Sequence, residues 1–315
     1  MTELEITRHN ALIDPGLHVW GWEIAVYLFL GGVAAGVMIL FAVLRRDAAG
    51  ARSRWDRALI FAAPALLSVG MLALLLDLHN PLNVFRFYTA FRPSSPMSWG
   101  AWILVAIYPA TLLLGLAGLT HAQVERLAAS ALIRRLRLGR LALRMHDFAR
   151  DHEGRARTLN LVLGIALGVY TGILLSSLGA RPAWNSALLG PLFLASGVSG
   201  GAALMMLTPV SHERHRGLLR WEMTAIALET VLLGLYLLGL AYSAGQTGQD
   251  AAALFLGGRF TAPFWALVVV AGLGVPLLLD ALERWRNLRP TPVSPALVLV
   301  GGLALRWILV LAGQS

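Results

Sequence analysis

Ionisable side chains inside apolar segments are the residues of this sequence that are best suited to chemistry. Carboxyl groups occur at Glu23, Asp77 and Glu229, an imidazole at His79 and a phenol at Tyr170, each within or at the end of a long apolar run. Groups of these types hold, accept and donate protons. Because an ionisable group is costly in hydrocarbon, its presence there indicates function. These residues therefore predict proton-coupled chemistry within a membrane.

The elements that must position these groups are long apolar helices. The chain of 315 residues is 57% hydrophobic and only 14% charged, which excludes a disordered protein, a typical nucleic-acid-binding domain and most soluble enzymes. A helix needs about 20 mostly apolar residues to cross a bilayer. Eight segments meet this length: 20–44, 57–78, 99–120, 158–178, 184–208, 221–242, 263–282 and 294–312. We therefore predict an all-α integral membrane protein with eight transmembrane helices.

The distribution of arginine predicts the orientation of these helices. All 26 basic residues are arginine, and the net charge is +9. The loop 121–157 carries nine arginines against four acidic residues, and the loops 45–56, 209–220 and 283–293 are also net positive. Positively charged loops stay in the cytoplasm. The pattern predicts a multi-pass protein of the bacterial inner membrane with both termini periplasmic, and its partner is the lipid bilayer rather than nucleic acid.

Two similar glycine-rich segments suggest an internal repeat. Residues 29–36 read FLGGVAAG and residues 193–201 read FLASGVSGG. Small residues let membrane helices pack closely, and parallel repeats occur in membrane folds. The single membrane domain 1–315 is therefore predicted to contain two four-helix halves, 18–178 and 184–312, the first of which holds most of the ionisable groups.

The chain offers few ligands for a redox metal. It has no cysteine, so it cannot ligate an iron–sulfur cluster through thiolates or attach a c-type haem. His18, His79, His121 and His212 all lie at predicted helix ends, whereas a membrane di-haem cytochrome needs histidines inside its helices. The sequence predicts no haem, no iron–sulfur cluster and no metal site, and the short basic stretch HERH at 212–215 is interpreted as solvated. Electrons handled here must reach an organic cofactor or another subunit.

Each ionisable group also has a simpler interpretation. Glu23 and Asp77 lie near the interface and are explained equally by hydration, and Arg306 by a side chain that extends to the outer headgroups. Tyr170 is explained by aromatic packing. Glu229 is less easily explained, because it lies about 10 Å inside its predicted helix. It is predicted to serve a proton path or to bind a structural water.

Four stretches of the sequence together resemble one protein family. They are YLFLGGVAAG at 27–36, DLHNPLNVFRFYTAFRPSSPMSWGAW at 77–102, YTGILLSSLGARPAWNSALLGPLFLASGVSGGAAL at 170–204 and ALRWILVLAGQ at 304–314. Over essentially its whole length the chain resembles the NrfD-like family of integral membrane subunits, the polysulfide reductase membrane-anchor type. This resemblance implies a peripheral iron–sulfur subunit of the four-cluster type, often a molybdopterin catalytic subunit, and electron exchange with menaquinone or ubiquinone near the outer face.

The resemblance also implies a quinone site. In the polysulfide reductase type this site uses polar residues of the first helices and a tyrosine of the fourth, which match Asp77 and Tyr170. Helix one departs from the family pattern, because Glu23 stands where an asparagine and a histidine are expected. The predicted quinone-binding residues are Glu23, Asp77, His79, Tyr170, Arg181, Trp184 and Asn185.

Three functions remain open at this point. The first is a membrane anchor of a respiratory oxidoreductase complex that exchanges electrons between quinone and the iron–sulfur subunit, so that the chain is a non-catalytic or quinone-reactive subunit. The second is a proton-translocating subunit without a functional quinone site, motivated by Glu229. The third is a secondary transporter, suggested by the number of spans and by the glycine pairs 31–32 and 200–201.

Overall fold

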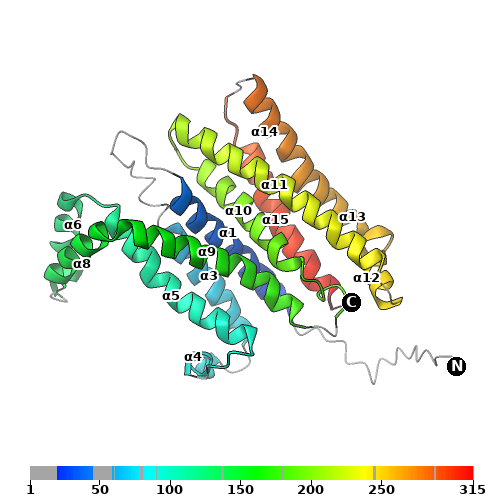
Figure 1. The fold of residues 1–315 in the computed structure, drawn as a ribbon, viewed down its shortest axis with the longest axis horizontal. Helices are drawn as coiled ribbons and strands as arrows, with labels where there is room; N and C mark the ends of the chain where they lie inside the picture. The colour runs from blue at the N-terminus through cyan, green and yellow to red at the C-terminus, as the bar shows by residue number, and fades with distance from the viewer. Residues whose placement is uncertain are drawn as a thin grey trace.

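The computed structural model describes residues 20–44, 59, 61–78, 81–89, 91–135, 138–178, 181–243, 246–286 and 289–314. Every regular element within these ranges is helical (Figure 1). The predicted site residue His79 lies outside the described residues, and so do His18 and the loop 45–56.

Eight helical segments correspond to the eight predicted spans. They are α1 (Trp22–Val43), α3 (Ala62–Asp77), α5 (Pro96–Ala117), α9 (Glu153–Ser176), α10 (Leu189–Met206), α11 (His212–Ala241), the continuous run α13–η2–α14 (Thr261–Pro263, Phe264–Gly274 and Val275–Arg286) and α15 (Val293–Ala312). Seven of them are long and apolar enough to cross a membrane, whereas α3 has 16 residues. Among the described residues the structure thus confirms an all-helical membrane protein and seven of the eight predicted spans.

Shorter helices connect the spans. On one side of the bundle η1 (Pro81–Asn83) and α4 (Arg86–Thr89) lie between α3 and α5, and α12 (Gln246–Leu256) lies between α11 and α13. At the opposite end α6 (His121–Ala128), α7 (Ala131–Arg135) and α8 (Gly139–Asp151) join α5 to α9 (Figure 1). The described part of the arginine-rich stretch 121–157 is therefore largely helical.

The sixth span begins earlier than its hydropathy predicts. The predicted segment 221–242 is part of α11, which starts at His212. The Ser211 hydroxyl accepts a hydrogen bond from the Arg214 amide at 3.3 Å and caps the helix. Because the added turns carry charged residues, hydropathy alone assigned them to a loop. This correction brings His215, which was interpreted as solvated, into the helix.

Glycines bring α1 and α10 into direct backbone contact at the centre of the bundle. A Cβ atom on Gly197 would lie 2.6 Å from the Gly32 carbonyl oxygen, and one on Gly36 would lie 2.7 Å from the Gly197 carbonyl carbon. Only glycine permits this approach, which is how helices associate closely in lipid. The two similar segments of the sequence therefore pack against each other, and both helices are largely buried.

The remaining helices gather around this central pair. Helices α3, α5 and α9 pack on the α1 side, and α11, α14, η2 and α15 pack on the α10 side. The two groups meet where α1 and α9 contact α10 and where α1 contacts α15. The division into two four-helix halves, and their relation as a repeat, stay predictions.

The two ends of the described chain lie side by side. The Trp20 amide donates to Gln314 Oε1 at 3.0 Å, and Gln314 Nε2 donates to the Trp20 carbonyl at 2.9 Å. These paired bonds tie the start of α1 to the end of α15, so both helix ends face the same side of the bundle.

Candidate functional site

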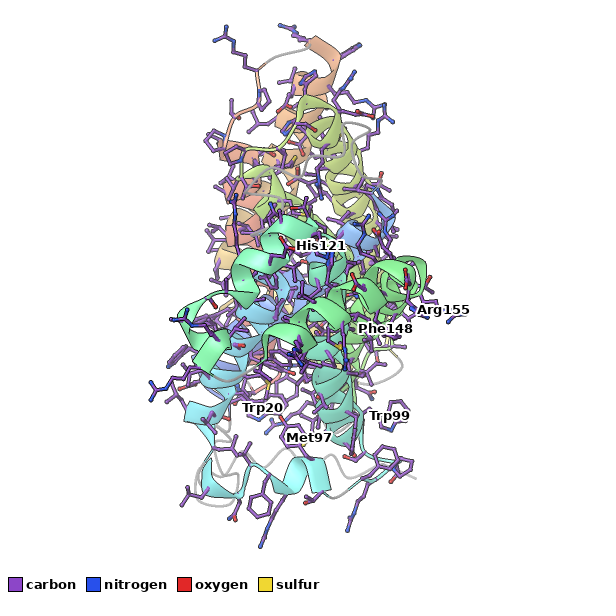
Figure 2. All side chains as sticks on the ribbon, turned by 90° about the vertical axis from the view of Figure 1, so that its left-hand side faces the viewer. Trp20, Met97, Trp99, His121, Phe148 and Arg155 are labelled. Atoms are coloured by element: carbon purple, nitrogen blue, oxygen red, sulfur yellow. The ribbon has the colours of Figure 1, made fainter. Side chains whose placement is uncertain are left out.

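Helices α1, α3, α5 and α9 surround a cavity of about 550 Å³ near the end of the bundle where α4 lies. Its wall is mostly apolar, with polar groups at a few points. The polar lining residues are Trp20, Tyr27, Ser68, Asp77, Tyr88 and Tyr170. Trp20 and Met97 of this wall lie at the same end of the molecule, beside the segment that contains α4 (Figure 2). Small-molecule sites in proteins have this size and composition.

The cavity opens towards the surface between α3 and α5. Two of its lining side chains, Leu72 and Met97, are 56% and 49% exposed. Both helices are apolar on their outer surface, so the opening faces the region that lipid occupies in a membrane. A ligand with an apolar tail can therefore enter this cavity sideways.

Tyr170 is held in the cavity wall by two neighbours. Its hydroxyl group is in hydrogen-bond contact with that of Tyr27, which comes from α1. Its ring lies over Gly100 of α5, where a Cβ atom would approach Tyr170 Cε1 to 2.5 Å and Cζ and Oη even more closely. The glycine of the SWGAW motif is thus required so that the phenol can turn into the cavity.

Asp77 reaches the same cavity from the last residue of α3. The sequence interpretation that Asp77 and Tyr170 lie at one depth is therefore supported by their shared cavity. Deeper in the wall, the Ser68 and Tyr108 hydroxyls are 3.0 Å apart and join α3 to α5. Tyr88 approaches from α4. Burial raises the pKa of its hydroxyl above the usual value, as does the neighbouring Tyr108, so Tyr88 remains a hydrogen-bond donor at neutral pH.

Four predicted binding residues do not line this cavity. The Glu23 side chain lies back against Gly21, and Arg181 and Asn185 form a tight turn in which the Asn185 amide donates to the Arg181 carbonyl at 2.9 Å. Trp184 is buried behind the wall: its ring stacks on that of Trp20 with centroids 5.0 Å apart. The Trp184 indole N–H donates to the Leu309 carbonyl at 2.7 Å. Trp184 thus supports the cavity wall from behind through Trp20, and none of the four residues lines the cavity.

A second polar site lies between α10, α11 and α15. Arg306 is 1% exposed, so it does not extend to the headgroups as one interpretation of the sequence supposed. Its Nη1 donates to Ser196 Oγ at 2.5 Å, and its Nη2 donates to the Phe193 carbonyl at 3.2 Å. Glu229 is buried on the facing helix and accepts a hydrogen bond from Ser199 Oγ at 3.2 Å. The buried carboxyl group therefore faces hydroxyls and a counter-charge.

Helix α11 carries a buried polar stripe that includes Glu229. His215, Glu222, Glu229 and Tyr236 follow at intervals of seven residues, which places them on one face of the helix. At one end His215 Nε2 lies 2.7 Å from Glu283 Oε1. At the other end the Tyr236 hydroxyl donates to the Ala183 carbonyl at 2.6 Å. The stripe thus runs along most of the helix inside the bundle.

Sequence reasoning missed Tyr27 and most of this stripe. Tyr27 lies one turn after Glu23 in the first span and was not distinguished from the apolar residues around it. His215 was assigned to a solvated loop because the start of α11 was placed too late, whereas Glu222 lay within the predicted span 221–242 and was not singled out. The signal available was the seven-residue spacing of Glu222 and Glu229, which extends to His215 once the helix begins at His212.

Taken together, the arrangement defines a helical membrane protein with a largely apolar cavity that carries a few polar groups and with a separate buried polar stripe. The family described as "Polysulphide reductase, NrfD" matches residues 10–315. This match covers nearly the whole chain, so the chain belongs to the NrfD family of polysulfide reductase membrane subunits.

Similar proteins span nearly the full length of this sequence. It is 33% identical to "Protein NrfD" of Escherichia coli (strain K12) over 311 residues, which cover 94% of this chain and 95% of that protein. It is 31% identical to one chain of the polysulfide reductase of Wolinella succinogenes, again over 94% of this chain and 95% of that protein. A more distant relative is a selenate reductase subunit of Mesobacillus selenatarsenatis, with 24% identity over 93% of this chain and 73% of that protein.

Proposed function

We propose that this chain is the membrane subunit of a respiratory oxidoreductase complex and that it binds quinol in the cavity around Tyr170. The observation that carries the proposal is the meeting of Asp77, Tyr27 and Tyr170, from three helices, in one largely apolar cavity. The relatives that are named as parts of reductases support a place in such a complex. A bound quinol would supply two electrons and two protons.

The cavity residues are suited to the proton and binding parts of this chemistry. The Tyr170 and Tyr27 hydroxyls, joined to each other, can hold one oxygen of a ring by hydrogen bonding. The Asp77 carboxyl group, at the outer rim, can accept a proton and release it to water. The apolar wall formed by residues such as Met71 and Leu104 excludes water from the ring. The gap between Leu72 and Met97 leaves room for a lipid-like tail.

The electron acceptor must lie outside this chain, because the chain has no cysteine with which to hold an iron–sulfur cluster. We place the docking surface of the iron–sulfur subunit on η1 and α4, next to the cavity. Leu82, Phe85 and Phe91 are exposed there beside Arg86 and Arg92. The Trp99 indole N–H donates to the Pro93 carbonyl at 2.6 Å, which ties the segment after α4 to the first turn of α5. By the distribution of arginine this face is periplasmic and the membrane is the bacterial inner membrane.

The experiment that tests the quinol site compares Tyr170→Phe and Asp77→Asn with the wild type in the intact complex. Both substitutions preserve shape, so assembly is expected to survive. We expect quinol-linked turnover to fall by about 10²-fold or more, because each removes a group that binds or takes up a proton. Tyr242→Phe is the matched control, since this exposed tyrosine lies at the outer end of α11, away from the cavity. Normal turnover in both variants would remove the proposed site.

A proton-conducting role is a second function that a specific observation favours. Glu229 is buried and interacts with Ser196, Ser199 and Arg306, within a polar stripe that spans much of α11. We propose that this stripe moves protons, either coupled to quinol oxidation or in place of it. Glu229→Gln keeps the hydrogen bonds but cannot release a proton. In liposomes we expect the complex containing this variant to transfer electrons without changing the internal pH, whereas the unaltered complex changes it. Equal pH changes in both would rule out Glu229.

One of the features that suggested a secondary transporter was the presence of glycine pairs, because transport folds often have helices broken near the membrane centre. The pairs 31–32 and 200–201 instead lie inside the unbroken helices α1 and α10. Their role in the described structure is close helix packing.

A further inference from the structure

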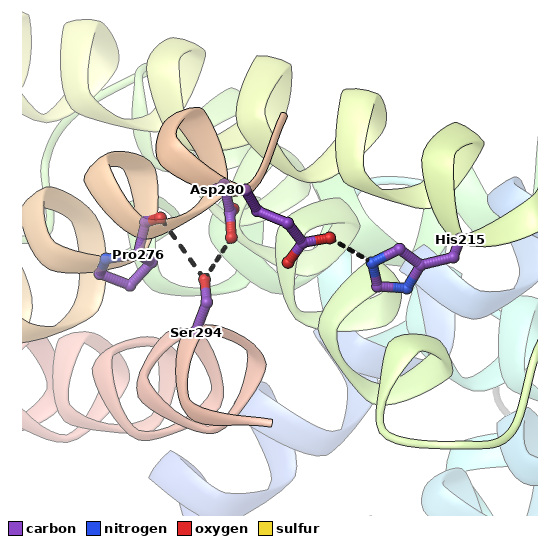
Figure 3. A network of polar contacts seen from close by, with 5 residues as sticks. His215, Pro276, Asp280 and Ser294 are labelled. Carbon is purple, nitrogen blue, oxygen red and sulfur yellow. Dashed lines mark hydrogen bonds and ion pairs between the residues drawn. The ribbon is translucent and has the colours of Figure 1, made fainter. Parts of the chain in front are cut away.

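Two acidic side chains, Glu222 of α11 and Asp280 of α14, are buried against each other near the end of the bundle opposite the cavity. Glu222 is 0% exposed and Asp280 is 1% exposed. Ser294, the second residue of α15, donates its hydroxyl to Asp280 Oδ1 at 2.5 Å and lies 3.4 Å from the Pro276 carbonyl (Figure 3). Three helices thus enclose the two carboxyl groups.

The remaining carboxyl oxygens lack donors. Within the described residues, no N–H or hydroxyl group donates to Asp280 Oδ2 or to either oxygen of Glu222. Yet Glu222 and Asp280 are close enough to hydrogen bond to each other. Such a bond exists only if one of the two carboxyl groups carries a proton. Two buried carboxylates without that proton would repel each other and leave three oxygens unsatisfied.

The hydrogen bond from Ser294 decides which group carries the proton. Asp280 already accepts from this hydroxyl, which stabilises its ionised form, whereas Glu222 has no other donor. A proton on Glu222 points to Asp280 Oδ2 and supplies the missing donor. Two further titratable groups act on the pair, Glu283 from α14 and His215 from α11. They form their own 2.7 Å contact closer to the helix ends (Figure 3).

We propose that Glu222 and Asp280 form a carboxyl pair that holds one shared proton and relays protons between the His215–Glu283 contact and Glu229. The proton leaves Glu222 as a new one reaches Asp280, so the pair keeps one proton and one negative charge before and after the transfer. Glu222 and Glu229 are seven residues apart on one helix face, about 10 Å by helix rise. The relay therefore requires a chain of hydrogen-bonded waters between the two carboxyl groups rather than direct contact. The relay depends on the proton movement proposed above for this protein. The proton shared by Glu222 and Asp280 does not depend on that proposal.

Infrared spectroscopy of the purified protein tests the shared proton without any redox partner. The wild type is expected to show a protonated-carboxyl C=O band at neutral pH that shifts in D₂O. Glu222→Gln is expected to remove this band, because the new amide donates to Asp280 and leaves it ionised. The matched control Glu213→Gln, an exposed residue of the same helix, is expected to leave the band unchanged. A band that disappears in Glu229→Gln instead is assigned to the Glu229 carboxyl group.

Two results would overturn the shared proton. One is a spectrum in which Glu222→Gln removes no protonated-carboxyl band. The other is a wild-type protein whose melting temperature is higher in sodium buffer than in choline buffer, while that of Glu222→Gln is the same in both. This pattern indicates a bound cation between two carboxylates in place of the proton. If Glu222→Gln does not fold, Ser294→Ala replaces it: losing the donor to Asp280 is expected to shift the band, and an unshifted band contradicts the pair.

The relay is tested separately in liposomes that contain the intact complex. Glu222→Gln is expected to slow proton movement at least tenfold while quinol-linked electron transfer continues. If the wild-type complex moves protons and this variant moves them at the same rate, the relay is refuted. The shared proton is then judged by the infrared spectra alone. Absence of proton movement in the wild type would refute the proposed function and the relay together.

Discussion

The position of Tyr170 depends on the absence of a side chain at Gly100, and this dependence makes a sharp test. A Cβ atom on Gly100 would lie 2.5 Å from Tyr170 Cε1. Carbon atoms in contact are about 3.5–4.0 Å apart, so Gly100→Ala must displace the ring by about 1 Å or more. The hydroxyl group would then leave its position beside Tyr27. The substitution therefore moves the phenol without removing it.

The expected effect on turnover is large. Misplacing a reacting group by about 1 Å costs about 10²-fold in rate, which corresponds to about 2.7 kcal/mol of transition-state stabilisation. We expect quinol-linked turnover of the Gly100→Ala complex to fall by about this factor. Overpacking is expected to lower the free energy of unfolding by about 1–3 kcal/mol as well. Turnover is measured with a soluble quinol analogue, and assembly by co-purification of the partner subunits.

A matched control separates ring displacement from the general effect of alanine in a helix. Gly234 of α11 has no described atom within 4 Å of its Cβ position, so Gly234→Ala is expected to leave turnover unchanged. In a Tyr170→Ala background, Gly100→Ala is expected to have little further effect, because there is no ring to displace. Wild-type kcat and KM in a correctly assembled Gly100→Ala complex would refute the positioning argument.

Two further predictions concern stability, measured by thermal unfolding in detergent or lipid. Arg306→Met removes the donor to Ser196 Oγ and to the Phe193 carbonyl, together with the positive charge that acts on Glu229, and is expected to cost about 1–3 kcal/mol; a wild-type melting temperature in this variant would contradict a stabilising role for the buried guanidinium. Gly36→Ala places a Cβ atom 2.7 Å from the Gly197 carbonyl carbon and is expected to cost about 1–3 kcal/mol by separating α1 from α10, whereas Gly154→Ala, with no described neighbour within 4 Å, should be neutral.

Hydropathy and arginine placement were sufficient to predict the helices of this protein. A long apolar segment in a bilayer must be helical, because lipid offers no partner for its backbone polar groups. This reasoning located seven of the eight spans, and α3 appears in the predicted place with 16 residues. It failed at the start of α11, where His215 is buried inside the protein rather than solvated.

For the candidate site, single residues were predictable but their grouping was not. Asp77, Tyr170 and Glu229 stand out in sequence because ionisable or polar groups are rare in apolar runs. Trp184, by contrast, belongs to a recognisable motif, yet the fold uses it to support Trp20 from behind. A motif shows that a residue type is required at a position, and it does not show which surface the side chain meets.

The sequence alone thus determined that the chain is a helical membrane protein of a recognisable family, without thiolate ligands for a redox metal. These properties follow from composition and local hydropathy, which act on each segment independently. The tertiary structure alone decided that Tyr27 meets Tyr170 across Gly100, and that Glu222 meets Asp280 between α11 and α14. Which helix faces meet depends on close packing at glycines such as Gly36 and Gly197, far apart in the chain. Contacts of this kind arise only when all helices have assembled.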